Sequence, residues 1–223
     1  MENVAGTPQD RAIETVIGIS KKFTSYQGMS YSAHEPPRLE PDWVSLAVEA
    51  VSEVAARDGF DRVLSLAGRD AGPWLLDVWW ANLADTERRV HLPAVWCGAE
   101  YPVQALPKKR WLEMFATVGY CYDVDPESTD LPEWWQEGPS QPVELFRGAP
   151  VSSAGLGMSW TLDHEVAQFF ADRWHDRGLK AEVYRTDVVP EAVLAFVHGR
   201  PEFEVVVDPS LLRDVHLRQP RWV

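Results

Sequence analysis

The sequence has few cysteines and no long apolar run. Its only two cysteines, Cys97 and Cys121, lie in apolar settings that favour buried free thiols, although a disulfide between them stays open. No apolar run is long enough to cross a membrane, so we expect no membrane partner. Residues 1–22 lack the charged start and apolar stretch of a secretory signal. We expect a cytoplasmic protein, with export or delivery as an effector left open.

Metal-ligand spacings and basic patches are also missing. The six histidines are scattered and, with two cysteines, form no zinc-ligand spacing, so we expect no metal. Lys and Arg number 21 against 34 Asp and Glu, which gives a net charge of −13. That charge disfavours nucleic acid as a partner, since its binders usually carry a basic patch. It leaves room for one dinucleotide, whose phosphates need only one or two well-placed donors.

The first part of the chain is rich in helical patterns. Hydrophobic residues make up 45%, enough for a core, and the 11 tryptophans mostly stand beside helical apolar positions, which indicates core packing. We expect a weakly ordered arm over 1–40 with one short helix near 11–19, and an acidic connector over 123–140. Residues 60–67 are apolar and of uncertain type. The expected helices are 42–58, ended by Gly59, then 73–83, and then 108–118, ended by Gly119.

After residue 140 the pattern changes to short strands. One amphipathic helix, expected over 163–177, interrupts them. This order predicts an α+β fold, a helical N-terminal half followed by a mainly antiparallel β core. We divide the chain into the arm (1–40), a helical accessory region (41–140) and a catalytic core (141–223), the last two forming one compact unit. The expected strands are 143–146, 159–162, 181–186, 192–197 and 202–207.

Three short motifs of this second half bear chemistry. Arg147 ends an apolar strand and is followed by Gly148; an arginine fork suits phosphate, but alone it fits a strand end in solvent better. Ser159 and Thr161 project to one face of a strand, where two hydroxyls can orient a carboxylate or a sugar. Thr161 can equally cap the following helix, as can Asp163.

The third motif is a pair of glutamates. Glu202 and Glu204 are two residues apart, so in an extended strand both carboxylates face the same side. Three valines, 205–207, continue that strand into the core. A charged side chain where a sheet should bury its residues costs free energy unless a hydrogen-bond or ion-pair partner compensates for it. Most isolated Glu–x–Glu pairs are ordinary surface glutamates on an exposed strand, and that alternative stays open for this one.

Together, the order Arg, Ser–x–Thr, Glu–x–Glu and three valines over residues 143–209 resembles the R-S-E class of mono-ADP-ribosyltransferases. The resemblance implies a β core of ADP-ribosyltransferase type and NAD as a substrate. Arg147 would hold the pyrophosphate or adjacent ribose, and Gly148 would offer its backbone to the nicotinamide carboxamide. Thr161 would support the strand or the nicotinamide end. The pocket wall would come from Phe169 or Phe170, for which core packing is a near-equal alternative.

The resemblance also assigns the catalytic groups. Glu204 would stabilise the positive charge that develops on the ribose as the nicotinamide bond breaks. Ser159 would position Glu204, and Glu202 would orient the attacking nucleophile. A glutamate at this earlier position favours a protein arginine as acceptor.

Two alternative functions are compatible with the same sequence features. One is an NAD glycohydrolase of the same fold, with water as acceptor; the other is a catalytically inactive interaction protein. By their reaction, transferases of this type are glycosyltransferases. Small ones are often toxins or effectors, and nucleotidyltransferase-like toxins are among the classes we consider. In that case we expect an immunity or antitoxin partner in addition to the protein target.

Overall fold

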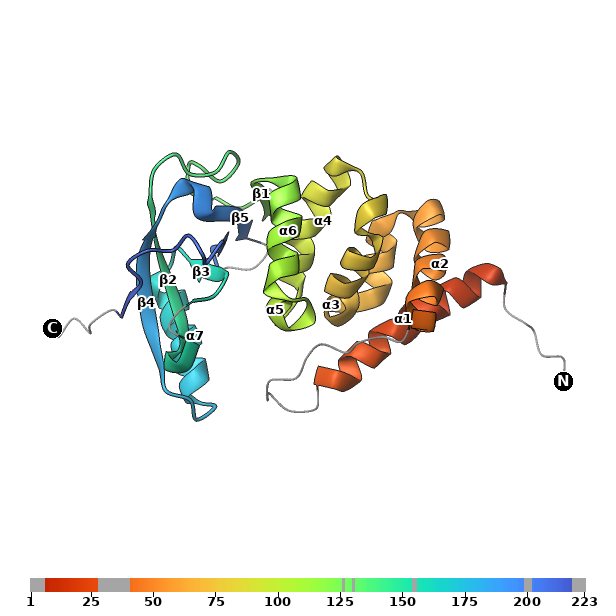
Figure 1. Ribbon diagram of the computed structural model, residues 1–223, viewed down its shortest axis with the longest axis horizontal. Helices are drawn as coiled ribbons and strands as arrows, with labels where there is room; N and C mark the ends of the chain where they lie inside the picture. The colour runs from red at the N-terminus through yellow and green to blue at the C-terminus, as the bar shows by residue number, and fades with distance from the viewer. Residues whose placement is uncertain are drawn as a thin grey trace. The chain divides into compact units, whose positions relative to one another are not determined.

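The computed structural model describes residues 7–27, 41–125, 127–129, 131–153, 156–198 and 202–217. Its contacts divide the chain into two compact units, Met1–Glu113 and Met114–Val223. The first consists of helices and the second is built on a sheet, so the α+β class is confirmed (Figure 1). The division lies well before the boundary expected near residue 140. The expected connector includes a strand that was not predicted, β1 (Cys121–Val124), which belongs to the second unit and pairs within the sheet.

The helical unit begins with a long helix instead of a weakly ordered arm. Residues 8–27 form α1, which packs against the next two helices through the buried Ala12, Val16 and Ile19. These three share one helix face by their spacing, an amphipathic pattern that the expectation of a short helix undervalued. Residues 28–40 of the expected arm lie outside the described residues. The helices are α1 (Pro8–Gln27), α2 (Pro41–Asp58), α3 (Phe60–Trp79), η1 (Trp80–Asn82), α4 (Asp85–Gly98), α5 (Pro102–Ala105) and α6 (Lys108–Val118).

Helix α3 joins two segments that the sequence treats separately. The apolar residues 60–67 are helical, and Gly68, with φ of 67°, breaks the regular helix before it continues past Pro73. Glycine adopts this left-handed φ without the steric cost that other residues meet. Helices α4 and α5 were not predicted, whereas α2 and α6 lie where expected.

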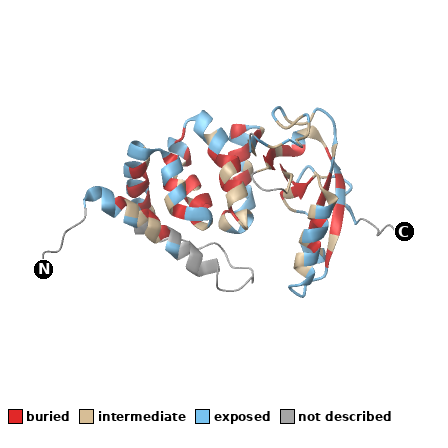
Figure 2. Cartoon of the chain, turned by 180° about the vertical axis from the view of Figure 1, so that it is seen from behind, coloured by how far each residue is buried: buried red, intermediate tan, exposed pale blue. Residues whose placement is uncertain are grey.

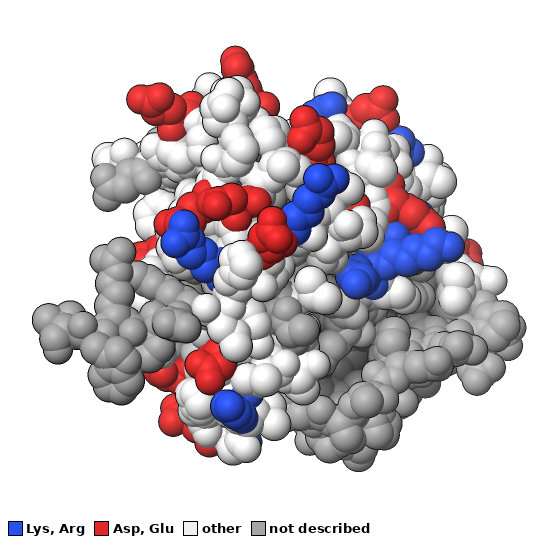
Figure 3. Space-filling view, turned by 60° about the vertical axis from the view of Figure 1, so that its left-hand side comes forward, with Lys and Arg blue, Asp and Glu red and all other residues white. Residues whose placement is uncertain are grey.

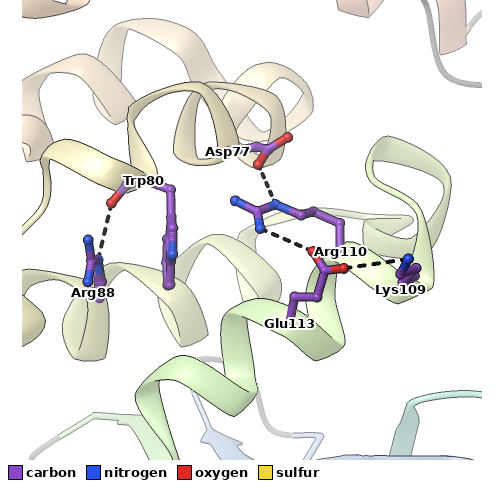
Figure 4. Close-up of polar contacts among 6 residues, drawn as sticks. All are labelled: Asp77, Trp80, Arg88, Lys109, Arg110 and Glu113. Atoms are coloured by element: carbon purple, nitrogen blue, oxygen red, sulfur yellow. Dashed lines mark hydrogen bonds and ion pairs between the residues drawn. The ribbon is translucent and has the colours of Figure 1, made fainter.

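Three tryptophans of the helical unit, Trp80, Trp96 and Trp111, are buried in its core, whereas Trp74 and Trp79 are partly buried. Trp96 and Trp111 are fully buried with ring centres 5.0 Å apart, edge to face. In Figure 2 the buried residues of this unit lie mainly on the helix faces that meet one another. A polar bridge ties α6 to α3, because Arg110 Nε donates to Asp77 at 2.6 Å and its Nη1 to Glu113 at 3.2 Å (Figure 4). Burial alone would lower the pKa of Arg110, but these two carboxylates outweigh it and raise that pKa.

The second unit is a seven-stranded sheet with the order β1-β5-β6-β3-β2-β4-β7. Its described pairs are antiparallel except β1 with β5, which are parallel. Four expected strands are present with shifted ends: 143–146, 159–162, 181–186 and 192–197. The helix expected over 163–177 is also present with shifted ends, as α7. The elements are β1 (Cys121–Val124), β2 (Val143–Pro150), η2 (Val151–Ser153), β3 (Ser159–Thr161), α7 (His164–His175), β4 (Ala181–Val188), η3 (Pro190–Ala192), β5 (Val193–His198), β6 (Glu204–Val207) and β7 (His216–Leu217).

The two faces of this sheet are buried differently. On one face Leu145, Trp160, Phe196 and Val205 belong to one core cluster. On the other, α7 lies along β2 and β4 and buries its Ala167 and Ala171 with Phe146 and Val183 (Figure 1). Because side chains alternate along a strand, the register assigns each site residue to one of these faces.

Cys97 and Cys121 are both free thiols, Cys121 buried and Cys97 partly exposed. Within the described ranges, no helix has the length and apolar character needed to span a membrane.

Candidate functional site

The three motifs meet on three neighbouring strands. Arg147 lies on β2, Ser159 and Thr161 on β3, and Glu204 at the first position of β6; in the sheet β3 stands between β2 and β6. Thr161 pairs with Phe146 on one side and with Glu204 on the other. Residues far apart in the sequence are therefore brought to one small region of the sheet.

Arg147 is held against the backbone of β3. Its Nη1 donates a hydrogen bond to the carbonyl oxygen of Ser159. Its Nε is buried and has no hydrogen-bond partner among the described residues. Burial lowers the pKa of Arg147, and the negative charge of Glu204 opposes that effect. A side chain at Gly157 would lie 2.3 Å from Arg147 Cζ, so this glycine makes room for the guanidinium.

The register separates Arg147 from the other candidates. Arg147 pairs with Tyr184, and Tyr184, Leu145 and Ala149 belong to the core cluster on one face. Alternation along the paired strands turns Ser159, Thr161 and Glu204 to the opposite face, which bears α7. Ser159 and Glu204 are diagonal neighbours on that face, since Ser159 pairs with Val206. Ser159 and Glu204 therefore lie close together on the face that bears α7. Arg147 lies on the other face and contacts β3 through the carbonyl oxygen of Ser159.

Glu202 does not lie in the strand that carries Glu204. Strand β6 starts at Glu204, Glu202 lies in the preceding turn, and Phe203 between them has φ of 45°. A left-handed residue breaks the alternation of side chains, so the expectation that one extended strand turns both carboxylates to the same side is wrong.

Two contacts from β3 hold this turn. The Thr161 hydroxyl donates a 2.6 Å hydrogen bond to the Glu202 carbonyl oxygen, and Leu162 N–H donates a 3.2 Å bond to the Phe203 carbonyl oxygen. Thr161, 5% exposed, also accepts a 3.0 Å bond from Asp163 N–H. Asp163 caps α7 by accepting from Glu165 N–H, which confirms the capping alternative for Asp163. Thr161 is therefore tied to the glutamate turn.

Gly148 and the phenylalanine pair lie around α7. A side chain at Gly148 would meet Ala167 O at 2.0 Å, so a packing requirement accounts for this glycine. Phe169 is 61% exposed and Phe170 is partly buried. Their rings are arranged edge to face, with ring centres 5.6 Å apart. Any role of these three residues toward NAD stays a prediction.

Two residues beside the site were missed by the sequence analysis. His198, the last residue of β5, stacks on Phe203 at 4.3 Å, and its buried Nδ1 has no hydrogen-bond partner among the described residues. Asp123 on β1 pairs with Val197, which pairs with Glu204, and burial raises the pKa of Asp123. Residues 121–124 (Cys-Tyr-Asp-Val) do not alternate in polarity, so no local pattern indicated a strand at Asp123.

Two further features of the described part of the protein are the distribution of its surface charge and the placement of its potential metal ligands. On the face drawn in Figure 3, acidic and basic side chains are interspersed. The described part of the chain holds no group of three His, Cys, Asp or Glu side chains placed to bind a metal ion. In the comparisons with known proteins, no family model, curated protein or solved structure matches the chain.

Proposed function

We propose that this protein is an NAD⁺-dependent mono-ADP-ribosyltransferase with Glu204 as its catalytic carboxylate. The observation that supports it is the adjacency of β2, β3 and β6, with Ser159, Thr161 and Glu204 on one face of the sheet and Arg147, on the other face, bound to the backbone of β3. A sequence resemblance spread over three separate motifs gains weight when those motifs lie on neighbouring strands.

The proposed chemistry centres on the nicotinamide–ribose bond. As that bond breaks, its electron pair leaves with nicotinamide and positive charge develops on the ribose. A fixed Glu204 carboxylate beside the ribose stabilises this charge, and Ser159 orients the carboxylate. Glu202 then accepts the proton of the attacking nucleophile. The favoured nucleophile, and hence the acceptor of the ADP-ribosyl group, is an arginine side chain of a target protein.

Arg147 has a narrower proposed role than the resemblance alone implies. Its Nη1 is already engaged with Ser159 O and its Nε is buried. The Nη1 bond fixes the strand that carries Ser159, and a phosphate oxygen of NAD would have to bind one of the other N–H donors of the guanidinium. Replacement of Arg147 would therefore disturb both NAD binding and the position of β3.

The test is incubation of the protein with NAD⁺ labelled in its adenylate part, together with a cell lysate. The wild type is expected to transfer label to lysate proteins, and Glu204→Gln is not. Nicotinamide release without labelling would instead favour the NAD glycohydrolase. A folded wild type that produces neither would leave the inactive interaction protein and overturn the proposal. The toxin or effector role and its immunity or antitoxin partner stay predictions.

A further inference from the structure

The turn that carries Glu202 is fixed at several points. Its two carbonyl oxygens, of Glu202 and Phe203, accept hydrogen bonds from Thr161 and Leu162, and the Phe203 ring stacks on His198. A non-glycine residue persists at a φ of 45° only when its surroundings hold it there. The turn conformation thus depends on these neighbours.

Thr161 is the side chain among these contacts that reaches Glu202 itself. It is 5% exposed, and its one hydroxyl both donates to Glu202 O at 2.6 Å and accepts from Asp163 N–H at 3.0 Å. Glu204, by contrast, is held by backbone pairing of β6 with β3 and β5. Loss of the Thr161 hydroxyl should therefore release Glu202 while leaving the strand of Glu204 in place.

We propose that Thr161 is a positioning residue that acts through Glu202 and so determines how efficiently a protein acceptor, rather than water, captures the ADP-ribosyl group. This inference rests on the proposed transferase function. Without the hydroxyl, the turn loses its hydrogen bond at the Glu202 carbonyl oxygen, and the Glu202 carboxylate is held less firmly for its proposed role toward the nucleophile. Nicotinamide release depends on Glu204, so it falls less than transfer does, and water accepts a larger share of the ADP-ribosyl group.

The chain offers a matched control in Thr186. Thr186 is also buried, 2% exposed, and its hydroxyl donates a 2.9 Å bond to a loop carbonyl, that of Arg213. It lies on β4, away from the Glu202 turn. Thr161→Val and Thr186→Val each remove a buried hydroxyl that donates to a loop carbonyl, and Thr161→Val also removes the acceptor of the Asp163 N–H.

The first readout is the ratio of label transferred to nicotinamide released. Thr161→Val and Thr161→Ala are expected to lower this ratio about fivefold or more, the size expected for the loss of one buried hydrogen bond. Thr161→Ser, which keeps the hydroxyl, and Thr186→Val should retain the wild-type ratio. An unchanged ratio in both hydroxyl-free variants, or an equal fall in Thr161→Ser, would overturn the inference.

A double variant separates action through Glu202 from any other effect. Glu202→Gln alone should lower transfer, and Thr161→Val added to it should lower transfer no further. An additional fall equal to that of Thr161→Val alone would show that Thr161 acts elsewhere.

A second readout needs no activity. Amide hydrogen exchange of a peptide covering residues 202–207 should become faster in the hydroxyl-free Thr161 variants and stay unchanged in Thr161→Ser and Thr186→Val. Wild-type exchange in the hydroxyl-free variants would overturn the inference whether or not the enzyme is active. A wild type that releases no nicotinamide would instead overturn the proposed function, so the two failures are distinguishable.

Discussion

Gly148→Ala should destabilise the sheet unit, because α7 packs directly on this glycine. The added Cβ would lie 2.0 Å from the carbonyl oxygen of Ala167 and 2.4 Å from the amide nitrogen of Ala171. Both are backbone atoms of α7, so a side-chain rotation cannot relieve the overlap. The helix must move by about 1.5 Å to restore ordinary contact distances.

The magnitude follows from the burial of this contact. Ala167 and Ala171 are 0% and 1% exposed, and a shift of α7 would open the packing around both. Overpacking of a core usually costs about 1–3 kcal/mol, and a clash with helix backbone should come near 3 kcal/mol. That is a large part of the roughly 5–15 kcal/mol by which domains are stable.

Urea denaturation monitored by tryptophan fluorescence measures the free energy of unfolding. Gly98→Ala is the control, because Gly98 ends α4 and an added Cβ there meets nothing within 4 Å. It should be neutral or stabilise by up to about 1 kcal/mol. A loss below about 0.5 kcal/mol in Gly148→Ala would refute the argument that α7 requires a glycine at this position.

Three further predictions concern the stability of the two units. Gly157→Ala should cost about 1–2 kcal/mol in urea denaturation, less than Gly148→Ala, because its Cβ would meet the movable guanidinium of Arg147; an equal or greater loss would contradict this. Asp123→Asn should raise the urea midpoint at neutral pH, since burial raises the pKa of the folded carboxyl and so disfavours its charged form. The gain should vanish below about pH 3.9, where Asp123 is protonated in both states, and a gain independent of pH would count against it. Asp77→Ala, which removes the 2.6 Å ion pair of Figure 4, should cost about 1 kcal/mol, whereas Lys109→Ala, whose side chain is 90% exposed, should be nearly neutral in the same measurement; equal effects would refute the distinction.

The sequence predicted those elements whose periodicity is strong and local. The helix at 108–118 has apolar residues at helical spacing and a glycine, Gly119, that ends it with φ of 74°. The strands of β2 and β4 show clear β-type runs. By contrast, β1 has only four residues and its partner, β5, lies far along the chain, so its pairing depends on tertiary contacts that no local pattern contains.

The site was predictable in its order but not in its local geometry. The succession of Arg147, Ser159 and Glu204 indicated strands that prove to be neighbours in the sheet. The left-handed Phe203 was not predictable, because phenylalanine has no preference for that conformation and contacts with β3 and β5 impose it. The burial of Arg147 likewise depends on Gly157, whose role appears only once β2 and β3 lie side by side.

The rate of nicotinamide release from NAD⁺ by the purified protein tests the central claim most directly. Glu204→Gln should lower that rate by about 10²-fold or more, because it removes the charge that stabilises the ribose transition state. Glu144→Gln is the matched control, because Glu144 on β2 is exposed and its carboxylate forms a salt bridge with Arg185. This variant should keep the wild-type rate. Release that Glu204→Gln leaves unchanged, or a folded wild type that releases no nicotinamide, would contradict the assignment of Glu204 as the catalytic carboxylate.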